Sequence, residues 1–244
     1  MTFSIVGRCK RTGHLGIGIA TSSPAVMSRC VHVSRDGAVA FQQTPDPRLG
    51  SLGLRLIGEG WWPHKVVQEL VANDKWPAKR QIGIVNSDGH AAAHTGDQGV
   101  PYAGHIVGDN HVALGNVLAG PEVTQAISEE FIAGAGLDLE ERLLRAIEAG
   151  RDAGGQLEGQ TSAGLLTYGR ETFSRCDLRV DVSEEPIAEL RRILDWYKPL
   201  IPFYEDRGRD PTSPRFKDYL AKENIQRTFG KPVPVTRGPK AGTR

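Results

Sequence analysis

The first twenty-three residues constrain the fold most, because they have the pattern of two strands joined by a tight turn. Apolar and polar side chains alternate in residues 2–6 (TFSIV), and residues 11–14 (RTGH) are typical of a turn. In residues 15–20 (LGIGIA) large side chains alternate with Gly and Ala, so one strand face is bulky and the other is nearly bare. We therefore predict an antiparallel hairpin whose second strand lies close to another backbone or to a ligand.

Thr2 directly follows Met1, and cellular aminopeptidases normally remove an initiator methionine when the second residue is small. A terminal Thr carries its own general base, because its free α-amino group, with a pKa of ~7.7–8.0, is partly neutral at physiological pH while its hydroxyl is the nucleophile. The alternative is that Thr2 only begins an edge strand, as β-branched residues often do. Position alone leaves both interpretations open.

Charge and hydropathy exclude several classes of partner. The formal net charge is +1 and the basic residues are scattered, which argues against nucleic acid or an anionic membrane as a partner. No apolar run reaches the length of a membrane-spanning helix, and the N-terminus lacks the pattern of a signal peptide. We expect a cytoplasmic protein that does not contact the membrane.

Cysteine and histidine spacing gives no sign of a metal or a cofactor. Cys9, Cys30 and Cys176 are odd in number and form no C-x-x-C motif, which favours buried free thiols over disulfides or zinc ligands. His90 and His94 would share one face of a helix, but the preceding turn sequence favours a strand. On a strand they lie about 13 Å apart, too far to bind one ion. We predict no metal and no cofactor.

Strands and helices are expected in alternating groups along the chain. Hydrophobic periodicity predicts further strands within residues 31–42, 81–85, 90–95, 104–119, 162–168 and 177–182, and helices around 52–57 and at 63–72, 121–133, 139–149 and 186–197. This order differs from the regular strand–helix alternation of a parallel sheet. It predicts an α+β protein with antiparallel sheets stacked between helical layers.

The composition changes near residue 198. Residues 1–197 form the expected domain, and residues 198–244 are rich in proline and charge, which predicts an arm without a packed core, partly disordered after about Thr228. One short helix is expected there, around Phe216, Tyr219 and Leu220.

Six short motifs together resemble a domain-of-unknown-function family, number 1028, which is placed in the N-terminal nucleophile (Ntn) hydrolase superfamily. The motifs are TFSIV at 2–6, GHLG at 13–16, ATSSPA at 20–25, DPRLG at 46–50, GNVLAG at 115–120 and GQTSA at 159–163. The resemblance covers about residues 2–194, and the N-terminal hairpin also looks like that of the asparaginase-type branch. The chain departs from relatives at Cys9-Lys10, where they often have Asp-Pro, which we interpret as a turn variation.

The resemblance implies a four-layer α-β-β-α sandwich and hydrolysis of an amide bond through an acyl-enzyme on Thr2. The expected substrate is a small molecule with an amide, ureido or peptide-like C–N bond. A second hypothesis is a non-catalytic, Ntn-like module for ligand binding or assembly, in which Thr2 is only the first strand residue. Since most soluble oligomers are symmetric dimers, we expect a homodimer or a higher homo-oligomer.

This chemistry also needs donors for the oxyanion of a tetrahedral intermediate. Asn116, between Gly115 and Val117 at a strand end, is the best candidate, although an Asn in such a place can equally satisfy a turn. Ser22 and Thr95 are hydroxyl residues at other strand ends, and we include them among the catalytic candidates.

The remaining candidates would contact substrate. Gln160 and Ser162 lie where a later strand begins and can orient the Thr2 amine or an amide, and Arg48, after Asp46 in the DPRLG motif, can bind a carboxylate through its fork of donors. Gly96 and His105 complete the set of expected substrate contacts. Each residue also has a purely structural alternative: a turn, a loop anchor or a surface side chain.

Overall fold

A computed structural model describes residues 1–99 and 102–225 of the chain. The chain divides into two compact units, Met1–Tyr197 and Lys198–Arg244, which are described separately. No helix in these described ranges has both the length and the apolar character needed to cross a bilayer.

The larger sheet of the first unit has six antiparallel strands in the order β10-β9-β2-β1-β8-β7. Its centre is the predicted N-terminal hairpin, with Thr2 opposite Thr21 and Arg8 opposite Leu15. The strands are β1 (Thr2–Arg8), β2 (Leu15–Thr21), β7 (Ala103–Gly108), β8 (His111–Asn116), β9 (Ser162–Tyr168) and β10 (Ser174–Val180).

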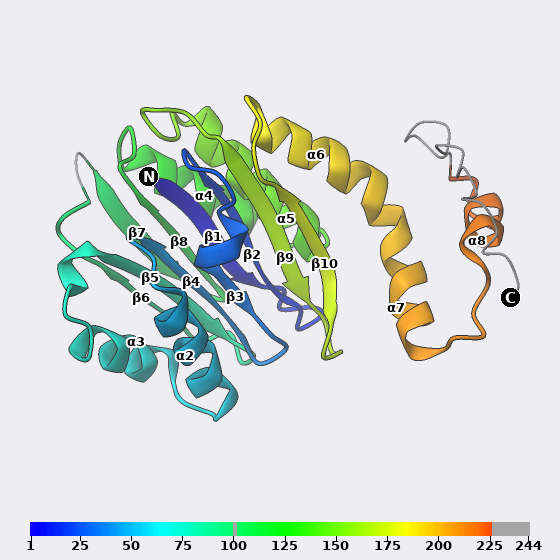
Figure 1. The fold of residues 1–244 in the computed structure, drawn as a ribbon, viewed down its shortest axis with the longest axis horizontal. Coiled ribbons are helices and arrows are strands. Elements are labelled where there is room, and N and C mark those ends of the chain that lie inside the picture. Colours follow the sequence, from blue (N-terminus) through cyan, green and yellow to red (C-terminus); the bar gives the residue numbers. More distant parts are fainter. Residues whose placement is uncertain (100–101, 226–244) are drawn as a thin grey trace, which may run out of the picture. The chain divides into compact units, whose positions relative to one another are not determined.

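The smaller sheet has four antiparallel strands in the order β3-β4-β5-β6 and faces the larger one (Figure 1). Its strands are β3 (Val31–Val33), β4 (Gly37–Gln43), β5 (Arg80–Asn86) and β6 (Ala91–Thr95). A buried apolar core fills the space between the sheets and includes Val6, Ile17, Ala40 and Leu114. Two antiparallel sheets with separate helices agree with the predicted α+β class.

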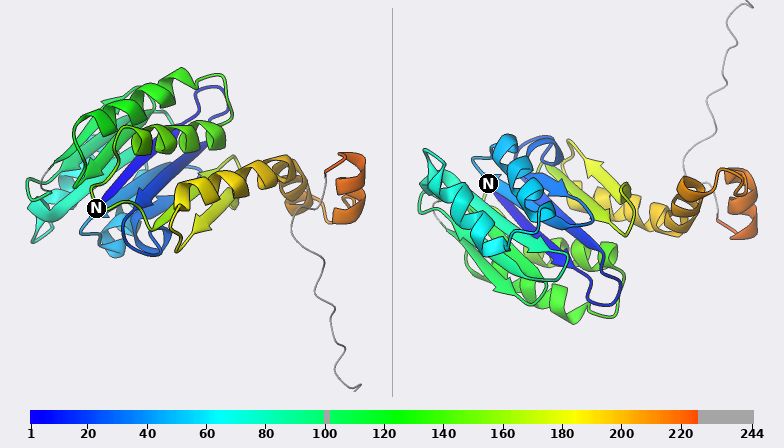
Figure 2. Two further views of the ribbon diagram at one scale, coloured as in Figure 1. Left: turned by 90° about the horizontal axis from the view of Figure 1, so that it is seen from above. Right: turned by 90° about the horizontal axis from the view of Figure 1, so that it is seen from below.

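Helices cover the outer face of each sheet (Figure 2). On the larger sheet lie α4 (Glu122–Ala133) and α5 (Leu139–Asp152), with α6 (Pro186–Tyr197) beside β9 and β10; on the smaller sheet lie α2 (Pro47–Gly58) and α3 (Pro63–Ala72). Two short elements, α1 (Met27–Cys30) and η1 (Pro77–Lys79), precede β3 and β5.

The bare face of β2 packs against α5, as the Gly and Ala pattern predicts. A Cβ atom on Gly18 would lie 3.0 Å from the backbone oxygen of Leu143, and one on Gly16 would lie 2.9 Å from Leu143 Cδ1. Gly16 and Gly18 therefore let the α5 backbone approach the sheet more closely than larger residues would allow.

The second unit contains more structure than expected: η2 (Lys198–Leu200), α7 (Ile201–Arg209) and α8 (Phe216–Lys222). The helix expected around Phe216, Tyr219 and Leu220 is α8, whereas η2 and α7 were not expected. Pro202 lies in the first turn of α7, where proline is tolerated because its missing N–H has no helical acceptor. The ring of Phe203 lies 5.0 Å from that of Tyr219 and 5.4 Å from that of Phe216. The predicted disorder after Thr228 falls outside the described residues.

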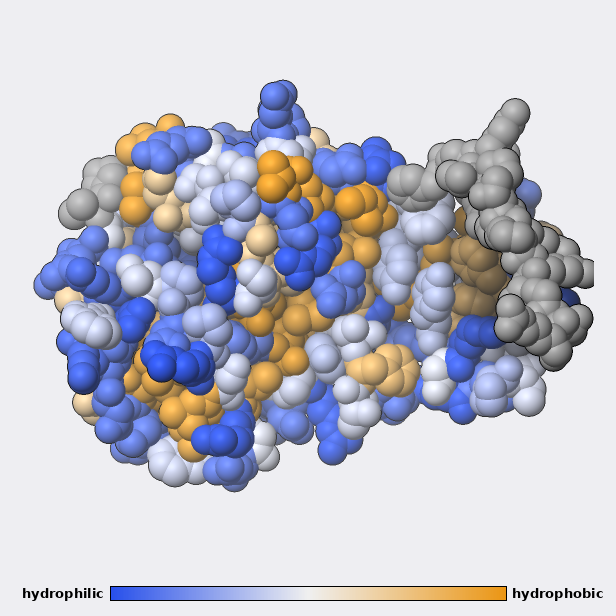
Figure 3. Space-filling model, in the orientation of Figure 1, coloured by the Kyte–Doolittle hydropathy of each residue, from blue (hydrophilic) through white to orange (hydrophobic). Residues whose placement is uncertain are grey.

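Figure 3 shows apolar side chains in several groups among polar ones on one face of the molecule. The large exposed ones include Trp61 and Trp62, between α2 and α3, and Ile132 on α4. Exposed apolar side chains are normal on a protein surface. Buried polar groups are therefore the better guide to a functional site.

Candidate active site

Polar residues from four neighbouring strands form one row at the end of the larger sheet where β1 begins. In register, Thr2 lies opposite Thr21 on one side and Asn116 on the other, and Thr21 lies opposite Ser162. Side chains that lie opposite each other share one face of a sheet. That face points toward the smaller sheet, because residues in phase with the row belong to the core between the sheets. Thr2 is 4% exposed and Asn116 is fully buried.

Gln81 on β5 connects this row to the smaller sheet. Its Oε1 accepts hydrogen bonds from Asn116 Nδ2 at 3.0 Å and from Gln42 Nε2 at 2.8 Å. Its Nε2 lies 2.8 Å from the carbonyl oxygen of Gly115 and 3.0 Å from that of Gly104. Gln81 is fully buried, so these bonds replace all of its contact with water.

The backbone carbonyls determine which way each amide of this network points. Because a carbonyl oxygen can only accept, Gln81 must direct its nitrogen toward them and its oxygen toward Gln42 and Asn116. Asn116 then presents its nitrogen to Gln81, and its Oδ1 is buried without a hydrogen-bond partner. A buried orphan acceptor beside Thr2 is unusual and indicates a place for an additional donor.

The Thr2 hydroxyl is hydrogen-bonded to the Thr21 hydroxyl, with 3.0 Å between the oxygens. Thr21 Oγ1 also donates to the carbonyl oxygen of Met1, and the Ser22 backbone N–H donates to the same oxygen at 3.4 Å. Since Thr21 has one hydroxyl hydrogen, Thr2 must be the donor in the Thr2–Thr21 bond. Ser22 thus contacts Met1 through its backbone and not through the predicted hydroxyl.

Two residues at the same end have a backbone conformation that is strained for their type. Val117, directly after Asn116, has φ = +54°, and Gln43, the last residue of β4, has φ = +74°. Positive φ is a genuine outlier for a β-branched residue such as Val. Strain of this kind clusters at functional sites, where the surrounding structure maintains it.

Thr95 and His105 extend the network toward the surface. Thr95 Oγ1 lies 3.0 Å from Gln81 Nε2 and 2.8 Å from His105 Nδ1, so its hydroxyl bridges the two side chains. Burial lowers the pKa of His105, and the nearby His94 lowers it further. Gly96 packs against the Ala78 backbone, because a Cβ atom there would lie 2.3 Å from the Ala78 oxygen.

The other predicted contacts have structural partners of their own. Ser162 Oγ donates to the Ser23 oxygen at 2.7 Å and accepts from the Val26 N–H at 3.1 Å, which anchors the segment after β2. Asp46 caps α2 and binds the Arg48 guanidinium, with 2.8 Å between its Oδ2 and Nη2. These hydrogen bonds from Arg48 lower the pKa of Asp46 to about 2.

Gln160 lies in the loop before β9, where its side chain packs against the backbone of Gly155. The neighbouring Gln156 is buried, and both polar atoms of its side-chain amide are without hydrogen-bond partners.

The three cysteines and the two histidines considered as metal ligands have other surroundings in the structure. Cys9, Cys30 and Cys176 are free and buried, and burial raises the pKa of Cys30 to about 11. The His90 ring lies 4.3 Å from the Trp62 ring at a tilt of 40°, whereas His94 Nε2 is hydrogen-bonded to the Pro77 oxygen. Within residues 1–99 and 102–225, no three His, Cys, Asp or Glu side chains are grouped to hold a metal.

Sequence reasoning missed Thr21, Ser4, Gln42 and Gln81. A signal for them exists in strand phase: Gln42 is in phase with the core residues Ala38 and Ala40, and Ser4 is in phase with Val6. Ser4 Oγ donates to Gln42 Oε1 at 2.8 Å, so polar residues at core positions of different strands are bonded to each other. Such residues need partners when buried, and they mark the network.

Comparison with known proteins finds a family of unknown function and a solved structure assigned to that family. The model of a family of unknown function, DUF1028, matches residues 2–190. The crystal structure of a protein from Silicibacter pomeroyi, assigned to the same family, is similar with a TM-score of 0.75 and 30% sequence identity; the match covers 81% of this chain and 86% of that one. No curated protein matches the sequence.

Proposed function

This chain belongs to the family of unknown function DUF1028, and from the geometry of its own residues we propose that it is an amidohydrolase with Thr2 as an amino-terminal nucleophile. The observation that carries the proposal is the position of Thr2. It begins the central strand of the larger sheet, it is almost fully buried, and its hydroxyl belongs to a row of polar groups between two sheets. A residue that only began an edge strand would have a neighbouring strand on one side, whereas Thr2 has β2 and β8 on its two sides.

Removal of Met1 would create the catalytic groups. The backbone nitrogen of Thr2 becomes a free amine next to its own hydroxyl, as the mechanism requires. The two donors that bind the Met1 carbonyl oxygen, Thr21 Oγ1 and the Ser22 N–H, are then available to the carbonyl oxygen of a substrate.

Asn116 supports this chemistry in two ways. Its orphan Oδ1 can accept a hydrogen bond from the Thr2 amine, which would orient the base. Its amide nitrogen bonds to Gln81 through one hydrogen, and the second hydrogen can serve as an oxyanion donor. The substrate we propose is a small molecule with an amide, ureido or peptide-like bond.

The arrangement of layers supports the same proposal. Two facing antiparallel sheets, each covered on its outer side by helices, are compatible with the four-layer α-β-β-α sandwich of Ntn hydrolases. In such a sandwich the nucleophile would lie at the end of the space between the sheets, where Thr2 is found here.

The test compares Thr2→Ala and Thr2→Ser with the parent on a panel of primary amides, ureido compounds and short peptides, with release of ammonia or amine as the readout. Intact mass first establishes that the parent starts at Thr2. We expect Thr2→Ala to be folded and inactive and Thr2→Ser to be partly active. Thr12→Ala, the same change in the β1–β2 turn at the other end of the hairpin, should keep full activity.

A retained Met1, or parental activity in Thr2→Ala, would reject the proposal. If the form with a free Thr2 binds an amide without turnover, the protein is a non-catalytic ligand-binding module instead.

A further inference from the structure

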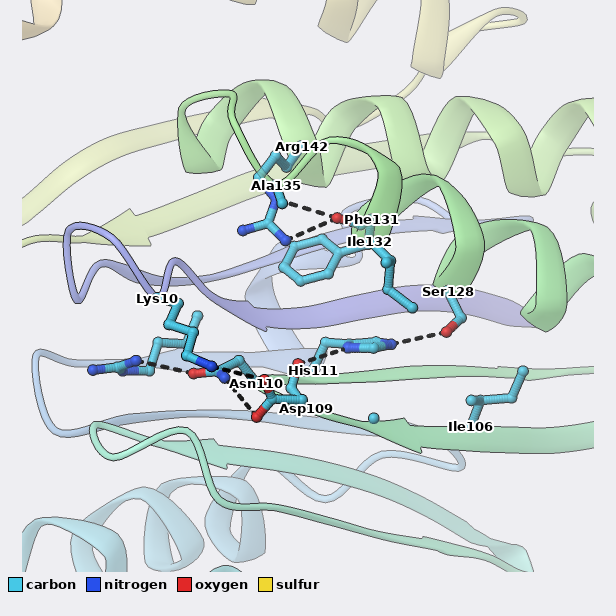
Figure 4. A pocket seen from close by; sticks show the side chains of 12 residues that line it. Lys10, Ile106, Asp109, Asn110, His111, Ser128, Phe131, Ile132, Ala135 and Arg142 are labelled. Atoms are coloured by element: carbon cyan, nitrogen blue, oxygen red, sulfur yellow. Dashed lines mark hydrogen bonds and ion pairs between the residues drawn. The ribbon is translucent and has the colours of Figure 1, made fainter.

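A cavity of about 380 Å³ lies at the other end of β1 from Thr2, between the β7–β8 hairpin and α4 (Figure 4). Its volume falls within the range of small-molecule sites. At 3.3–3.4 Å per strand residue, Thr2 and Arg8 are about 20 Å apart. The cavity is therefore separate from the proposed active site, and the following inference does not depend on that proposal.

Two guanidinium groups at the cavity have no carboxylate partner among residues 1–99 and 102–225. Arg142 is 6% exposed, and its Nε and Nη2 donate to the Phe131 oxygen at 3.2 and 2.8 Å. Arg8 donates from Nη1 to Asn110 Oδ1 at 2.9 Å, and its Nε is buried without an acceptor. Burial of a cation without a counter-charge is costly, so these groups favour an anion.

The acidic residue that lines the cavity does not supply this counter-charge. Asp109 Oδ2 lies 3.5 Å from Lys10 Nζ, and Asp109 Oδ1 accepts from Asn110 Nδ2 at 2.8 Å. The Asp109 carboxylate is thus matched by Lys10. Arg142 lies over the face of the Phe131 ring, with 3.9 Å between its Cζ and the ring centroid, and it interacts with the Cys9 side chain. Neither Arg8 nor Arg142 has a carboxylate as its counter-charge within the described residues.

The floor of the cavity is polar but neutral. His111 Nδ1 lies 3.1 Å from the Asp109 carbonyl oxygen, which can only accept, so Nδ1 carries the hydrogen. Nε2 therefore accepts from the Ser128 hydroxyl at 2.8 Å. Burial lowers the pKa of His111, which keeps the ring uncharged.

The remaining wall is apolar and includes Ile106, Phe131, Ile132 and Ala135. Ile132 is 57% exposed, although it is a large apolar side chain on a helix. Figure 4 shows Phe131 and Ile132 on the same side of the cavity as Arg142. Cations and an apolar wall are thus presented to the same space.

We propose that this cavity binds a small monocarboxylate with an apolar body. The carboxylate would pair with the Arg8 and Arg142 guanidinium groups, and the hydrocarbon or aromatic body would cover Phe131 and Ile132. Both features of the cavity are used by such a ligand, whereas an inorganic anion uses only the cations and a neutral apolar molecule uses only the wall.

Calorimetric titration of the full chain with hexanoate, hexan-1-ol and hexylammonium tests the charge requirement. We expect hexanoate to bind about tenfold more tightly than the alcohol, and hexylammonium not to bind. Acetate, which has the charge without the body, should bind at least about tenfold more weakly than hexanoate. Equal binding of acid and alcohol, or no hexanoate binding at concentrations up to about 10 mM, overturns the proposal.

Two pairs of variants locate the site. Arg8→Met should weaken hexanoate binding about tenfold, while Arg11→Met, which removes an exposed cation outside the cavity, should not. Ile132→Glu brings a carboxylate to the cavity wall and should abolish hexanoate binding. Ile132→Gln introduces a neutral side chain of the same length as Glu and should retain more of the hexanoate binding. Ile132 is exposed, so neither change removes core packing. Unchanged binding in both Arg8→Met and Ile132→Glu would place the ligand elsewhere and reject the proposal.

Discussion

Asn116 Nδ2 donates a hydrogen bond to Gln81 Oε1 at 3.0 Å, which joins the last residue of β8 to β5 across the space between the two sheets. Gln81 is the centre of the buried network, because it also bonds to Gln42, to Thr95 and to two backbone carbonyls. The network therefore couples the proposed active site to the packing of the sheets.

Gln81→Leu should lower the free energy of unfolding by about 2 to 4 kcal/mol, because it leaves several buried polar groups without partners. Denaturant unfolding measures this change. Gln125→Leu is the matched control, since Gln125 on α4 is exposed, and it should change stability by less than about 0.5 kcal/mol. If both variants change the free energy of unfolding by similar amounts, the buried network does not stabilise the fold as proposed.

Asn116→Ala should lower kcat on a confirmed substrate by roughly a hundredfold, the size of one lost oxyanion donor. Steady-state kinetics with Asn73→Ala as an exposed control measure the effect. Because Asn116 is fully buried, the melting curve of the variant must show that it is folded before its rate is interpreted. A rate change under about threefold in the folded variant would remove Asn116 from this role.

Stability should fall as the pH drops below about 6.5, and His111 contributes to this loss. Burial lowers the pKa of His111 in the folded state, whereas the unfolded chain has the ordinary value near ~6.5. Below that pH the unfolded state binds a proton that the folded state does not bind, so acid favours unfolding, by up to about 1.4 kcal/mol per pH unit for one group. The contribution is absent above the unfolded pKa.

His111→Gln should therefore reduce the slope of unfolding free energy against pH between about pH 5 and 6.5, measured by urea titration at several pH values. The slope should not vanish, because burial also lowers the pKa of His32 and His105. His64→Gln, on an exposed histidine of α3, is the control. An identical slope in His111→Gln and the parent would contradict the assignment.

Local sequence patterns predict the hairpins and helices because alternation and periodicity report which face of each element is buried. The Gly and Ala face of β2 predicted close approach of another backbone or a ligand, and this face packs against α5. The Gln81 network was not predicted, because it depends on which strands face each other across the core. That pairing joins Ser4 to Gln42 and Gln81 to Asn116 over long sequence separations.

Two other features escaped prediction for separate reasons. Pro202 suggested an unstructured arm, but a proline in the first turn is compatible with α7. The cavity at Arg8 combines side chains from the end of β1 and the loop after it, from the β7–β8 hairpin and from the α4–α5 region. No motif connects these segments in the sequence.

The last prediction concerns the chain terminus, because a self-activated nucleophile depends on chain position as well as on side-chain identity. An uncleaved N-terminal tag turns the Thr2 amine into a peptide N–H, which has no basic lone pair, while every side chain is retained. The tagged protein should have an unchanged melting curve and no hydrolase activity, and removal of the tag to expose Thr2 should restore turnover.

The rate of the protein with a free Thr2 should fall at low pH. The amine is the base only when neutral, so the rate should fall as the pH drops below the pKa of the Thr2 amine. Burial lowers the pKa of the Met1 amine one residue away, and the Thr2 site is more enclosed still. The midpoint of the pH–rate profile is therefore expected below the usual ~7.7–8.0. If tagged and free forms have equal activity, the nucleophile is an internal residue and the Thr2 mechanism is rejected.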